Sequence, residues 1–520
     1  MTTAQKNIKK VDFKKEPIKK VLETFETGKR PKGGVGGITE GIPSIGGEHL
    51  EFNGDFDFTN IRFIPEDFFH EMNSGVIKKQ DVLVVKDGAT TGKTSFVSDA
   101  FPYEKAAINE HIFILRSDKT KITPKYLFYW MMSPLGQKAV QDNFKGTAQG
   151  GINTSFFKNS FIEYPEDQDF QKKITQNIET QFSLLEAGEK ALERAKINLH
   201  RYKASVLKAA CEGRLVPTEA ELAHKKGWEY EPADVLLKRI LQDRQKRWEE
   251  EEWQNQIERA KKKAAQAKKK AEGKRGYMRD LKDEEWQDLP EEDYGKYLPK
   301  SDKWKKKYQE PDPPDTDGLP ELPEGWIWLT LPQIGIIGRG KSKHRPRNDP
   351  KLYGGNYPFI QTGDIREAQG KIRKYSQTYN ENGLAQSKLW PKGTLCITIA
   401  ANIAETAILD FDSCFPDSVV GFISSDGIST KFIEYYIRTA KQNLEQYAPA
   451  TAQKNINLGT LSELAVPLPP KKEQIRIVQT LDKKLSIIEN QNMILKENLI
   501  KAEQLRQTIL KNAFEGKLVN

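Results

Sequence analysis

Apolar residues recur at every seventh position in two long, otherwise polar stretches of the chain. The first series is Ile178, Leu185, Leu192, Leu199 and Val206, and the second is Leu481, Ile488, Leu495, Ala502 and Ile509. A seven-residue repeat of this extent predicts two long helices, each of about forty residues and about 60 Å, that pack together as a coiled coil. The alternative, in which each helix lies on its own domain, is less favoured because a domain surface rarely needs so long an apolar stripe.

Shorter apolar runs, separated by turns rich in Gly, Asn and Asp, precede each long helix. Strand-like runs occupy residues 82–85, 112–115 and 395–399, and helix-like segments occupy residues 125–131 and 431–437. This pattern predicts two mixed α/β domains, at about residues 17–165 and about residues 326–469.

The two halves of the chain also repeat one another in sequence. Residues 207–216 return as residues 510–519 at an offset of 303, and residues 147–153 return as residues 451–457 at an offset of 304. Chance matches do not keep so constant an offset, so the chain contains a large internal duplication. The apolar series of the two helices has the offset of 303 as well. A duplication of this size predicts two similar working surfaces in one molecule.

Composition narrows the class of protein. A chain of 520 residues is too long for one hydrophobic core and predicts two or three domains. The net charge of +9 suits a polyanionic partner, although basic soluble proteins without such a partner are also common. The three cysteines and six histidines lack disulfide or ligand spacing, so no metal site is expected. The N-terminus has no apolar signal core and no run reaches membrane-spanning length, so we expect a cytoplasmic protein.

One region has no partner in the duplication. Residues 218–310 are highly charged, and their lysine- and alanine-rich run at 259–275 is either a basic helix that contacts phosphates or, more commonly for such a run, a solvated helical face. Residues 311–323 contain five prolines and predict a stiff linker without regular structure.

Two segments imitate catalytic motifs. Residues 88–94 (GATTGKT) resemble a phosphate-binding loop, but only three residues separate the first glycine from Gly-Lys where the motif needs four, and Glu405 replaces the lysine in the second half. The tripeptide at 312–314 resembles the start of an amino-methyltransferase tetrapeptide, but Asp315 stands where an aromatic ring is required. The sequence therefore indicates no catalytic residue.

The remaining candidates are residues that could contact DNA. The repeated loops at 145–153 and 451–457 concentrate amide, hydroxyl and lysine groups that can pair with base edges, and the basic clusters at 28–32 and 340–347 can hold phosphates. The alternative is that the Gln and Asn side chains of the loops only stabilise turns. The predicted DNA contacts are Lys29, Arg30, Lys32, Lys93, Lys145, Thr147, Gln149 and Asn153 in the first half, and Lys341, Lys343, Arg345, Arg347, Asn402, Gln453, Lys454, Asn455 and Asn457 in the second.

Several short motifs resemble those of the specificity (S) subunits of type I restriction–modification systems. They are residues 322–328 (LPEGWIW), the loop at 453–457, residues 467–474 (PLPPKKEQ) and the two endings EGRLV and EGKLV at 212–216 and 515–519. The resemblance covers essentially the whole chain. It implies an α+β fold in which two duplicated α/β target recognition domains are joined by two long antiparallel helices that form a coiled coil. The implied domains are 1–167 (target recognition domain 1), 168–217 (central long helix), 218–325 (charged helical insertion and Pro-rich linker), 326–470 (target recognition domain 2) and 471–520 (C-terminal long helix).

The resemblance also implies a function. The chain would be a non-catalytic subunit that binds double-stranded DNA at a bipartite site and directs two methyltransferase (M) subunits and the restriction (R) subunits to it, in defence against foreign DNA. S-adenosylmethionine, ATP and magnesium would be bound by those partners. The first half has Gly150-Gly151 where the second has Lys454-Asn455, so the two half-sites are expected to differ. A stand-alone DNA methyltransferase or nucleotide hydrolase, and a coiled-coil scaffold that binds no DNA, are the alternatives.

Overall fold

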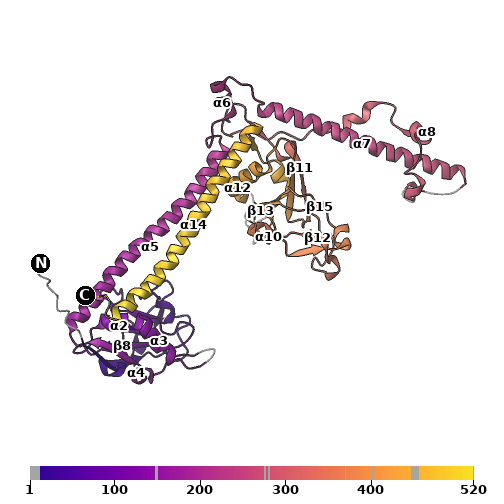
Figure 1. Cartoon of the computed structure of the whole chain (residues 1–520). Coiled ribbons are helices and arrows are strands. Elements are labelled where there is room, and N and C mark those ends of the chain that lie inside the picture. The colour runs from indigo at the N-terminus through magenta and orange to yellow at the C-terminus, as the bar shows by residue number, and fades with distance from the viewer. Residues whose placement is uncertain are drawn as a thin grey trace. The chain divides into compact units, whose positions relative to one another are not determined.

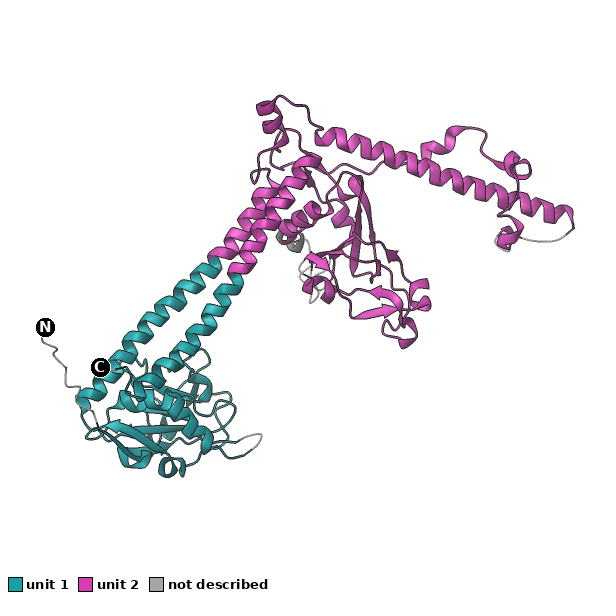
Figure 2. Ribbon diagram, in the orientation of Figure 1, with its two compact units in different colours: residues 1–197, 492–520 teal, residues 198–491 magenta. Residues whose placement is uncertain are grey.

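The structure is a computed structural model of the full chain, in which two compact units are distinguished (Figure 2). Unit 1 comprises residues 1–197 and 492–520, and unit 2 comprises residues 198–491. The residues described are 12–146, 150–273, 277–278, 281–368, 370–400, 403–446 and 456–518. Both long helices pass from one unit into the other, so each unit contains a part of each helix.

Unit 1 contains a mixed α/β domain with a four-stranded antiparallel sheet of order β2-β8-β5-β6 and a three-stranded sheet of order β4-β3-β7 (Figure 1). Its strands are β1 (Phe13–Pro17), β2 (Leu22–Thr27), β3 (Ile42–Ile45), β4 (Arg62–Ile64), β5 (Val82–Val85), β6 (Thr94–Phe96), β7 (Ala107–Ile108), β8 (Ile112–Ser117) and β9 (Phe161–Pro165). Its helices before the first long helix are α1 (Glu66–His70), α2 (Pro124–Met132), α3 (Pro134–Asp142) and α4 (Phe156–Asn159), with short 3-10 turns at Ile18–Val21 and Gly47–His49.

Strand β5 and residues 112–115 of β8 are continuous apolar runs because both faces of their sheet are covered. Val82 and Val84 pack in the same core as helix α2, whereas Leu83 and Val85 pack in a second core on the opposite face. Residues that alternate between two apolar cores cannot show the polar alternation of a half-exposed strand. The predicted strands at 82–85 and 112–115 and the predicted helix at 125–131 therefore lie in the centre of this domain.

Unit 2 contains the second mixed α/β domain, with a five-stranded sheet of order β11-β19-β16-β17-β13 and a four-stranded sheet of order β14-β12-β18-β15. The strands are β10 (Ile327–Leu329), β11 (Gly335–Arg339), β12 (Tyr353–Phe359), β13 (Gly370–Ile372), β14 (Gln377–Tyr379), β15 (Leu389–Trp390), β16 (Leu395–Thr398), β17 (Thr406–Leu409), β18 (Ser413–Cys414), β19 (Val419–Ser424) and β20 (Val466–Leu468). The helices are α9 (Leu331–Ile334), α10 (Thr362–Glu367), α11 (Glu381–Ala385), α12 (Thr430–Gln446) and α13 (Leu458–Ser462), with a 3-10 turn at Pro350–Leu352.

The two domains end in the same way. In unit 1, β1 pairs antiparallel with β9, and in unit 2, β10 pairs antiparallel with β20. Each ribbon leads directly into a 44-residue helix, α5 (Gln168–Cys211) or α14 (Lys471–Phe514). At 1.5 Å per residue each helix is about 66 Å long.

A buried glutamine joins each long helix to its domain. Gln171 accepts a hydrogen bond from the N–H of Thr123 (2.8 Å), which precedes α2, and donates to the carbonyl oxygen of Pro165 (2.8 Å). Gln474 accepts from the N–H of Ser429 (2.8 Å), which precedes α12, and donates to the carbonyl oxygen of Pro469 (2.9 Å). Both side chains are fully buried. Because buried polar groups need partners, these bonds fix the start of each helix.

The two long helices pack against each other in both units. In unit 1, Ile178 and Phe182 of α5 share a core with Ile509 and Ala513 of α14. In unit 2, residues near the end of α5 share a core with residues near the start of α14. Of the predicted seam, Ile178, Val206, Leu481, Ile488, Ala502 and Ile509 are buried, and Leu185, Leu192, Leu199 and Leu495 are half-buried. The seam is thus tightest near the two domains.

The charged region between the two halves is folded. It contains α6 (Glu219–Lys226), the 39-residue helix α7 (Ala233–Ala271), α8 (Glu291–Tyr294) and 3-10 turns at Asp283–Glu285, Gly295–Tyr297 and Asp302–Lys307. Residues 308–326 form no helix or strand, as the prolines predict. Within the described part of the chain, no helix is long and apolar enough to cross a membrane.

Candidate nucleic-acid interface

In unit 1 the loop that imitates a phosphate-binding motif lies beside the repeated loop. Residues 88–92 form a turn between β5 and β6, and the N–H of Gly88 donates to the carbonyl oxygen of Gly150 (3.0 Å). Gly151 and Lys145 exchange two backbone hydrogen bonds of 2.9 Å. A Cβ on Gly151 would lie 2.3 Å from the carbonyl oxygen of Lys86, so only glycine permits this approach. A turn between two strands lacks the helix N-terminus that a nucleotide site of this type uses.

The basic cluster at 28–32 lies on the same domain because of another close approach. It follows β2 directly, and a Cβ on Gly28 would lie 2.1 Å from the carbonyl oxygen of Ile108. Lys29, Arg30 and Lys32 are exposed beyond this contact. The absence of a side chain at Gly28 therefore brings the basic cluster beside the residues that follow β7.

Two hollows in the surface of this domain gather the polar residues. The first, of about 410 Å³, is lined by Lys29, Arg30, Pro31, Val35, Ser44, Glu48, Arg62, Asn109, Glu110 and His111. The second, of about 430 Å³, is lined by residues 87–90 together with Gly47, Val85 and two residues of the first hollow, Glu48 and His111. The hollows thus connect the basic cluster to the turn that carries the repeated loop.

Three pairs of ionisable side chains line these hollows. Arg30 lies 3.3 Å from Glu110, Arg62 lies 3.3 Å from Glu48, and His111 Nδ1 lies 2.5 Å from Asp87. The two arginines are more than half exposed. Exposed pairs of this kind contribute about 0–1 kcal/mol. Their guanidinium groups can therefore turn to phosphates or guanine at little cost.

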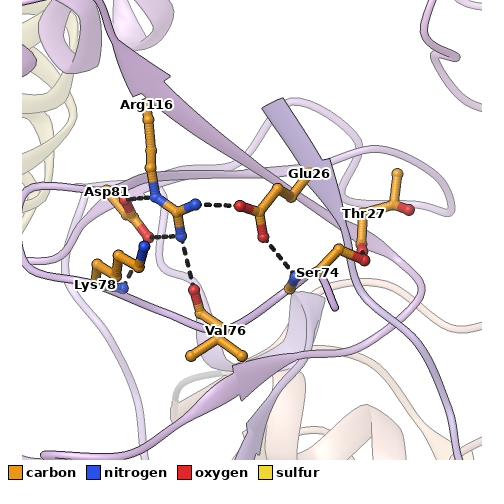
Figure 3. Close-up of polar contacts among 8 residues, drawn as sticks. Glu26, Thr27, Ser74, Val76, Lys78, Asp81 and Arg116 are labelled. Atoms are coloured by element: carbon orange, nitrogen blue, oxygen red, sulfur yellow. Dashed lines mark hydrogen bonds and ion pairs between the residues drawn. The ribbon is translucent and has the colours of Figure 1, made fainter. Parts of the chain in front are cut away.

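A largely buried ionic network lies where β2, β8 and the segment before β5 meet (Figure 3). Arg116 of β8 donates from Nε to Asp81 (2.9 Å) and from Nη2 to the carbonyl oxygen of Val76 (2.7 Å), and Nη1 bonds to Glu26. Glu26 also accepts from the N–H of Gly75 (2.6 Å). Burial raises the pKa of Asp81, and the hydrogen bond and charge of Arg116 oppose that rise. The network ties β2, β8 and the segment before β5 together.

In unit 2 the corresponding basic cluster follows β11 and is held in the same way. A Cβ on Gly340 would lie 2.3 Å from the carbonyl oxygens of Phe415 and Pro416. The four predicted contacts Lys341, Lys343, Arg345 and Arg347 are exposed. Arg345 donates to the carbonyl oxygen of Ser342 (2.6 Å), and Arg347 lies 2.6 Å from Asp417.

Three further predicted contacts have partners within their own domain. Lys93 lies over the ring of Phe52, 4.7 Å from its centroid. Asn153 accepts from the N–H of Ser155 (2.9 Å), and Asn457 accepts from the N–H of Thr460 (2.9 Å) at the start of α13. Asn153 thus stabilises a turn and Asn457 caps helix α13, and their contacts with DNA stay a prediction.

The remaining predicted contacts comprise one described residue and six that lie outside the described residues. Lys145, at the start of the repeated loop of unit 1, is exposed. Thr147, Gln149, Asn402, Gln453, Lys454 and Asn455 lie outside the described residues.

Sequence reasoning missed residues that the fold brings to the surface hollows. Glu48 lies in the 3-10 turn at Gly47–His49, Arg62 in β4, and Asn109 and His111 in the connection between β7 and β8, and their sequence spacing carries no signal. In unit 2, a hollow of about 440 Å³ is lined by residues 371–376 together with Asp364, Glu367 and Ala368. Its Arg-Lys-Tyr sequence at 373–375 is exposed, with Tyr375 about half exposed. A basic tripeptide with an aromatic ring is a signal that could have been noticed. Among the described residues, no group of three or more His, Cys, Asp or Glu side chains could hold a metal ion.

Two mixed α/β domains, each closed by a β-ribbon and followed by a 44-residue helix, define a protein with two recognition domains on a shared helix pair. The family model described as the type I restriction modification DNA specificity domain matches residues 31–194 and 323–499, one segment in each half. The chain belongs to this family. The resemblance and the fold class predicted from the sequence are thereby confirmed.

Known relatives carry the same description. The specificity subunit of the type I restriction enzyme MjaIX from Methanocaldococcus jannaschii is 24% identical over 218 residues, which cover 41% of this chain and 48% of that protein. The EcoDI specificity subunit from Escherichia coli is 27% identical over 208 residues, which cover 38% of this chain and 44% of that protein. The chain thus matches less than half the length of each of these relatives.

Two solved structures share the fold over nearly their whole length. One is the HsdS subunit from Thermoanaerobacter tengcongensis, with a TM-score of 0.53, 14% identity and 97% of both chains covered. The other comes from a study of complex assembly and conformational transition of the type I restriction–modification system, with a TM-score of 0.56, 15% identity, and 98% of this chain and 99% of that chain covered.

Proposed function

We propose that the chain is the DNA-binding specificity subunit of a type I restriction–modification system, and that it recognises a bipartite, asymmetric DNA sequence. The observation that carries this proposal is the duplication. Both domains keep a buried glutamine at the helix start, Gln171 or Gln474. Both also keep a glycine before the basic cluster, Gly28 or Gly340, which we call the clamped glycine because it lies close to a neighbouring carbonyl oxygen. The side chains around the loops differ. A shared frame with different loops suits two readers of different half-sites.

The chemistry of the hollows in unit 1 fits a DNA groove. Arginine and lysine side chains can hold phosphates and fix the register of the domain. Carboxylates such as Glu48 repel phosphates, but they accept hydrogen bonds from the amino group of cytosine. A hollow that contains both kinds of group is therefore better suited to base edges than to backbone alone.

Partner subunits would dock on the helices. In unit 1, the helix pair exposes a set of large apolar side chains, and Leu184, Met493 and Ile500 are each more than half exposed. Exposed apolar residues in such number indicate a protein interaction surface. We assign it to methyltransferase (M) subunits, two per complex, with restriction (R) subunits joining for cleavage. S-adenosylmethionine, ATP and magnesium belong to those partners in this proposal, and the chain itself is non-catalytic.

The experiment is methylome sequencing of a host that expresses the chain with its methyltransferase subunit. The expected result is one methylated motif of two unequal halves, separated by a fixed number of unread base pairs, which disappears when the chain is deleted. Purified chain alone should neither transfer methyl groups nor hydrolyse ATP. Turnover by the isolated chain would favour the stand-alone enzyme, and a complex whose DNA binding ignores sequence would favour the scaffold.

A further inference from the structure

The charged region that follows the first long helix forms a folded arm, comprising α7 and residues 281–308. The base of the arm belongs to the core of unit 2, because Ala233, Leu236 and Ile240 are buried there. Arg244 strengthens the attachment by donating to the carbonyl oxygens of Pro332 and Gly335. The arm is therefore fixed to the second recognition domain at its base.

Residues 281–308 return along one side of α7 and cover it (Figure 1). The buried ring of Trp304 lies 6.1 Å from that of Trp248 and 5.8 Å from that of Trp253, between ring centroids. Further along, Ala260 and Ala264 are buried beneath the returning segment. An aromatic cluster and buried alanines mean that α7 is not a helix solvated on all sides.

Six of the seven cations in the distal half of α7 lie on two faces, and the seventh, Lys268, is exposed. Residues 259–271 contain seven cations and no carboxylate. On the covered side, Lys261 donates to the carbonyl oxygen of Gln287 (2.5 Å), Lys262 lies over the ring of Trp286, 4.3 Å from its centroid, and Lys269 lies 2.6 Å from Glu285. These inner lysines have partners in the arm itself.

The opposite face of α7 carries Arg259, Lys263 and Lys270, at spacings of four and seven residues that place them on one side of the helix. Arg259 pairs with Glu252 at 3.4 Å, whereas among the described residues no carboxylate pairs with Lys263 or Lys270. Both lysines are exposed. We call these three residues the outer basic face.

A helix that only needs to be soluble usually mixes opposite charges four residues apart. The base of α7 does so, with Asp234 and Lys238 at 3.5 Å. Like charges at that spacing, such as Arg259 and Lys263, cost about 0.2–0.5 kcal/mol. The helix dipole favours cations only in the last turn, which accounts for Lys270 but not for Lys263 two turns earlier. The outer basic face is thus unfavourable in isolation and suits an anionic partner.

We infer that the outer basic face of α7 binds the phosphate backbone of duplex DNA beside the half-site read by unit 2. The inference rests on the proposed function, which places DNA against the same unit. The face extends over about 17 Å of helix axis. Duplex DNA carries about one charge per 1.7 Å of its own axis, so several phosphates lie within reach. Contacts of this kind add affinity without reading sequence.

The test compares two variants of the full chain in complex with its methyltransferase subunits. The first variant carries Lys263→Gln and Lys270→Gln on the outer basic face. The matched control carries Lys303→Gln and Lys306→Gln, which remove the same charge from exposed positions of the returning segment. Glutamine and lysine have similar helix propensities, so α7 should persist, and circular dichroism checks this. Two duplexes carry the methylated motif, one ending at the half-site of unit 2 and one extending two helical turns beyond it.

For the unchanged chain we expect tighter binding to the extended duplex, with a steeper dependence of affinity on salt between about 50 and 200 mM. The first variant should lose this difference, with a salt slope smaller by roughly two and an unchanged motif. The control should behave like the unchanged chain. A first variant that keeps the full slope, or a control that loses as much, would overturn the inference. If the unchanged chain showed no sequence-specific binding, that result would instead contradict the proposed function.

Discussion

The same pair of strands is supported in different ways in the two domains. In unit 1, β2 and β8 carry Glu26 and Arg116, which form the buried ionic network with Asp81. In unit 2, the corresponding positions of β11 and β19, counted from the clamped glycine, are Gly338 and Ile423. The buried ring of Trp390 occupies the space there, 3.3 Å from where a Cβ on Gly338 would lie.

This difference separates frame from support. The backbone that leads into each basic cluster approaches a neighbouring carbonyl closely, at Gly28 in unit 1 and at Gly340 in unit 2. The groups beneath that backbone have diverged from an ion network to an aromatic ring. Loops placed on different supports can present different side chains, as the proposed recognition of two unequal half-sites requires.

Exchanging a whole domain should have the largest effect on recognition. Replacing residues 17–165 with the corresponding domain of another family member should change one half of the methylated motif completely and leave the other half intact. The reason is that each domain has its own cores and loops. Methylome sequencing measures the result, and exchange of residues 326–469 is the reciprocal control. A motif changed in both halves would contradict the independence of the domains.

Changing the length of α5 and α14 should alter only the number of unread base pairs between the two half-sites. One heptad added to both α5 and α14 lengthens each helix by about 10.5 Å, or about three base pairs of duplex. Both half-sites should remain while the number of unread base pairs between them rises. A control in which a heptad is replaced by another of equal length should keep the original spacing. An unchanged spacing in the lengthened variant would mean that the length of the helices does not set the distance between the half-sites.

The sequence predicted the frame better than the site, for a physical reason. Heptads and buried strands are local patterns, so the helices around Ile178 and Leu481 could be located from periodicity alone. The hollows of unit 1 depend on the strand order β4-β3-β7, which brings Arg62 and Asn109 together across 47 residues of chain. No local pattern encodes that proximity.

Some side-chain partners could be expected from the sequence, and others could not. Asn153 stabilises a turn and Asn457 caps helix α13, and asparagine is a common residue at both kinds of position. The arm shows the opposite difficulty. Its charge dominates its composition, although Trp304 and its two tryptophan partners give it a packed centre.

The supports can be tested by removing them. Arg116→Ala leaves the buried carboxylate of Asp81, which is 2% exposed, without its cation. We expect the free energy of unfolding of unit 1 to fall by about 3–5 kcal/mol. Trp390→Ala should cost unit 2 a similar amount, about 3–5 kcal/mol, by leaving a cavity. Urea unfolding, with hydrogen exchange to assign each unit, gives both values.

The matched control for Arg116→Ala is Lys105→Ala. The exposed pair of Lys105 with Glu66, at 3.9 Å, should contribute less than about 1 kcal/mol to the free energy of unfolding. Arg116→Ala should also weaken base preference in the half-site of unit 1 alone. Equal loss of preference in both half-sites would mean that the network does not support one set of loops.

We call the buried glutamine at the start of each long helix, with its hydrogen-bond partners, a joint. The two joints should respond alike to loss of the glutamine. Gln171→Leu leaves the N–H of Thr123 and the carbonyl oxygen of Pro165 without partners, and Gln474→Leu does the same to Ser429 and Pro469. Each change should destabilise its own unit by about 2–4 kcal/mol. Gln176→Leu and Gln479→Leu, at exposed positions of the same helices, are the controls and should change stability little. If only one unit responded to loss of its buried glutamine, the two joints would not be equivalent.

The smallest expected effect is a pH dependence of stability that only the joint of unit 2 should show. Glu473, the neighbour of Gln474, is fully buried, and its carboxylate accepts from the N–H of Glu219 (2.8 Å) and from Nε1 of Trp326 (3.0 Å). The corresponding residue of the first helix is Phe170, which cannot titrate. Burial raises the pKa of Glu473 to about 7, although these donors and Arg476 act against the rise.

A carboxyl whose pKa is raised on folding stabilises the native state only while it is protonated. The unfolded chain loses this proton at about pH 4.3 and the native chain at about pH 7, so the stability of unit 2 should fall as the pH rises through that interval, by about 1–3 kcal/mol. Glu473→Gln should flatten the pH dependence of the unit 2 transition. Glu489→Gln, at an exposed position of α14, should leave it unchanged. If the pH dependence of unit 2 survived Glu473→Gln, another group would be responsible, and the joints would differ only in their packing.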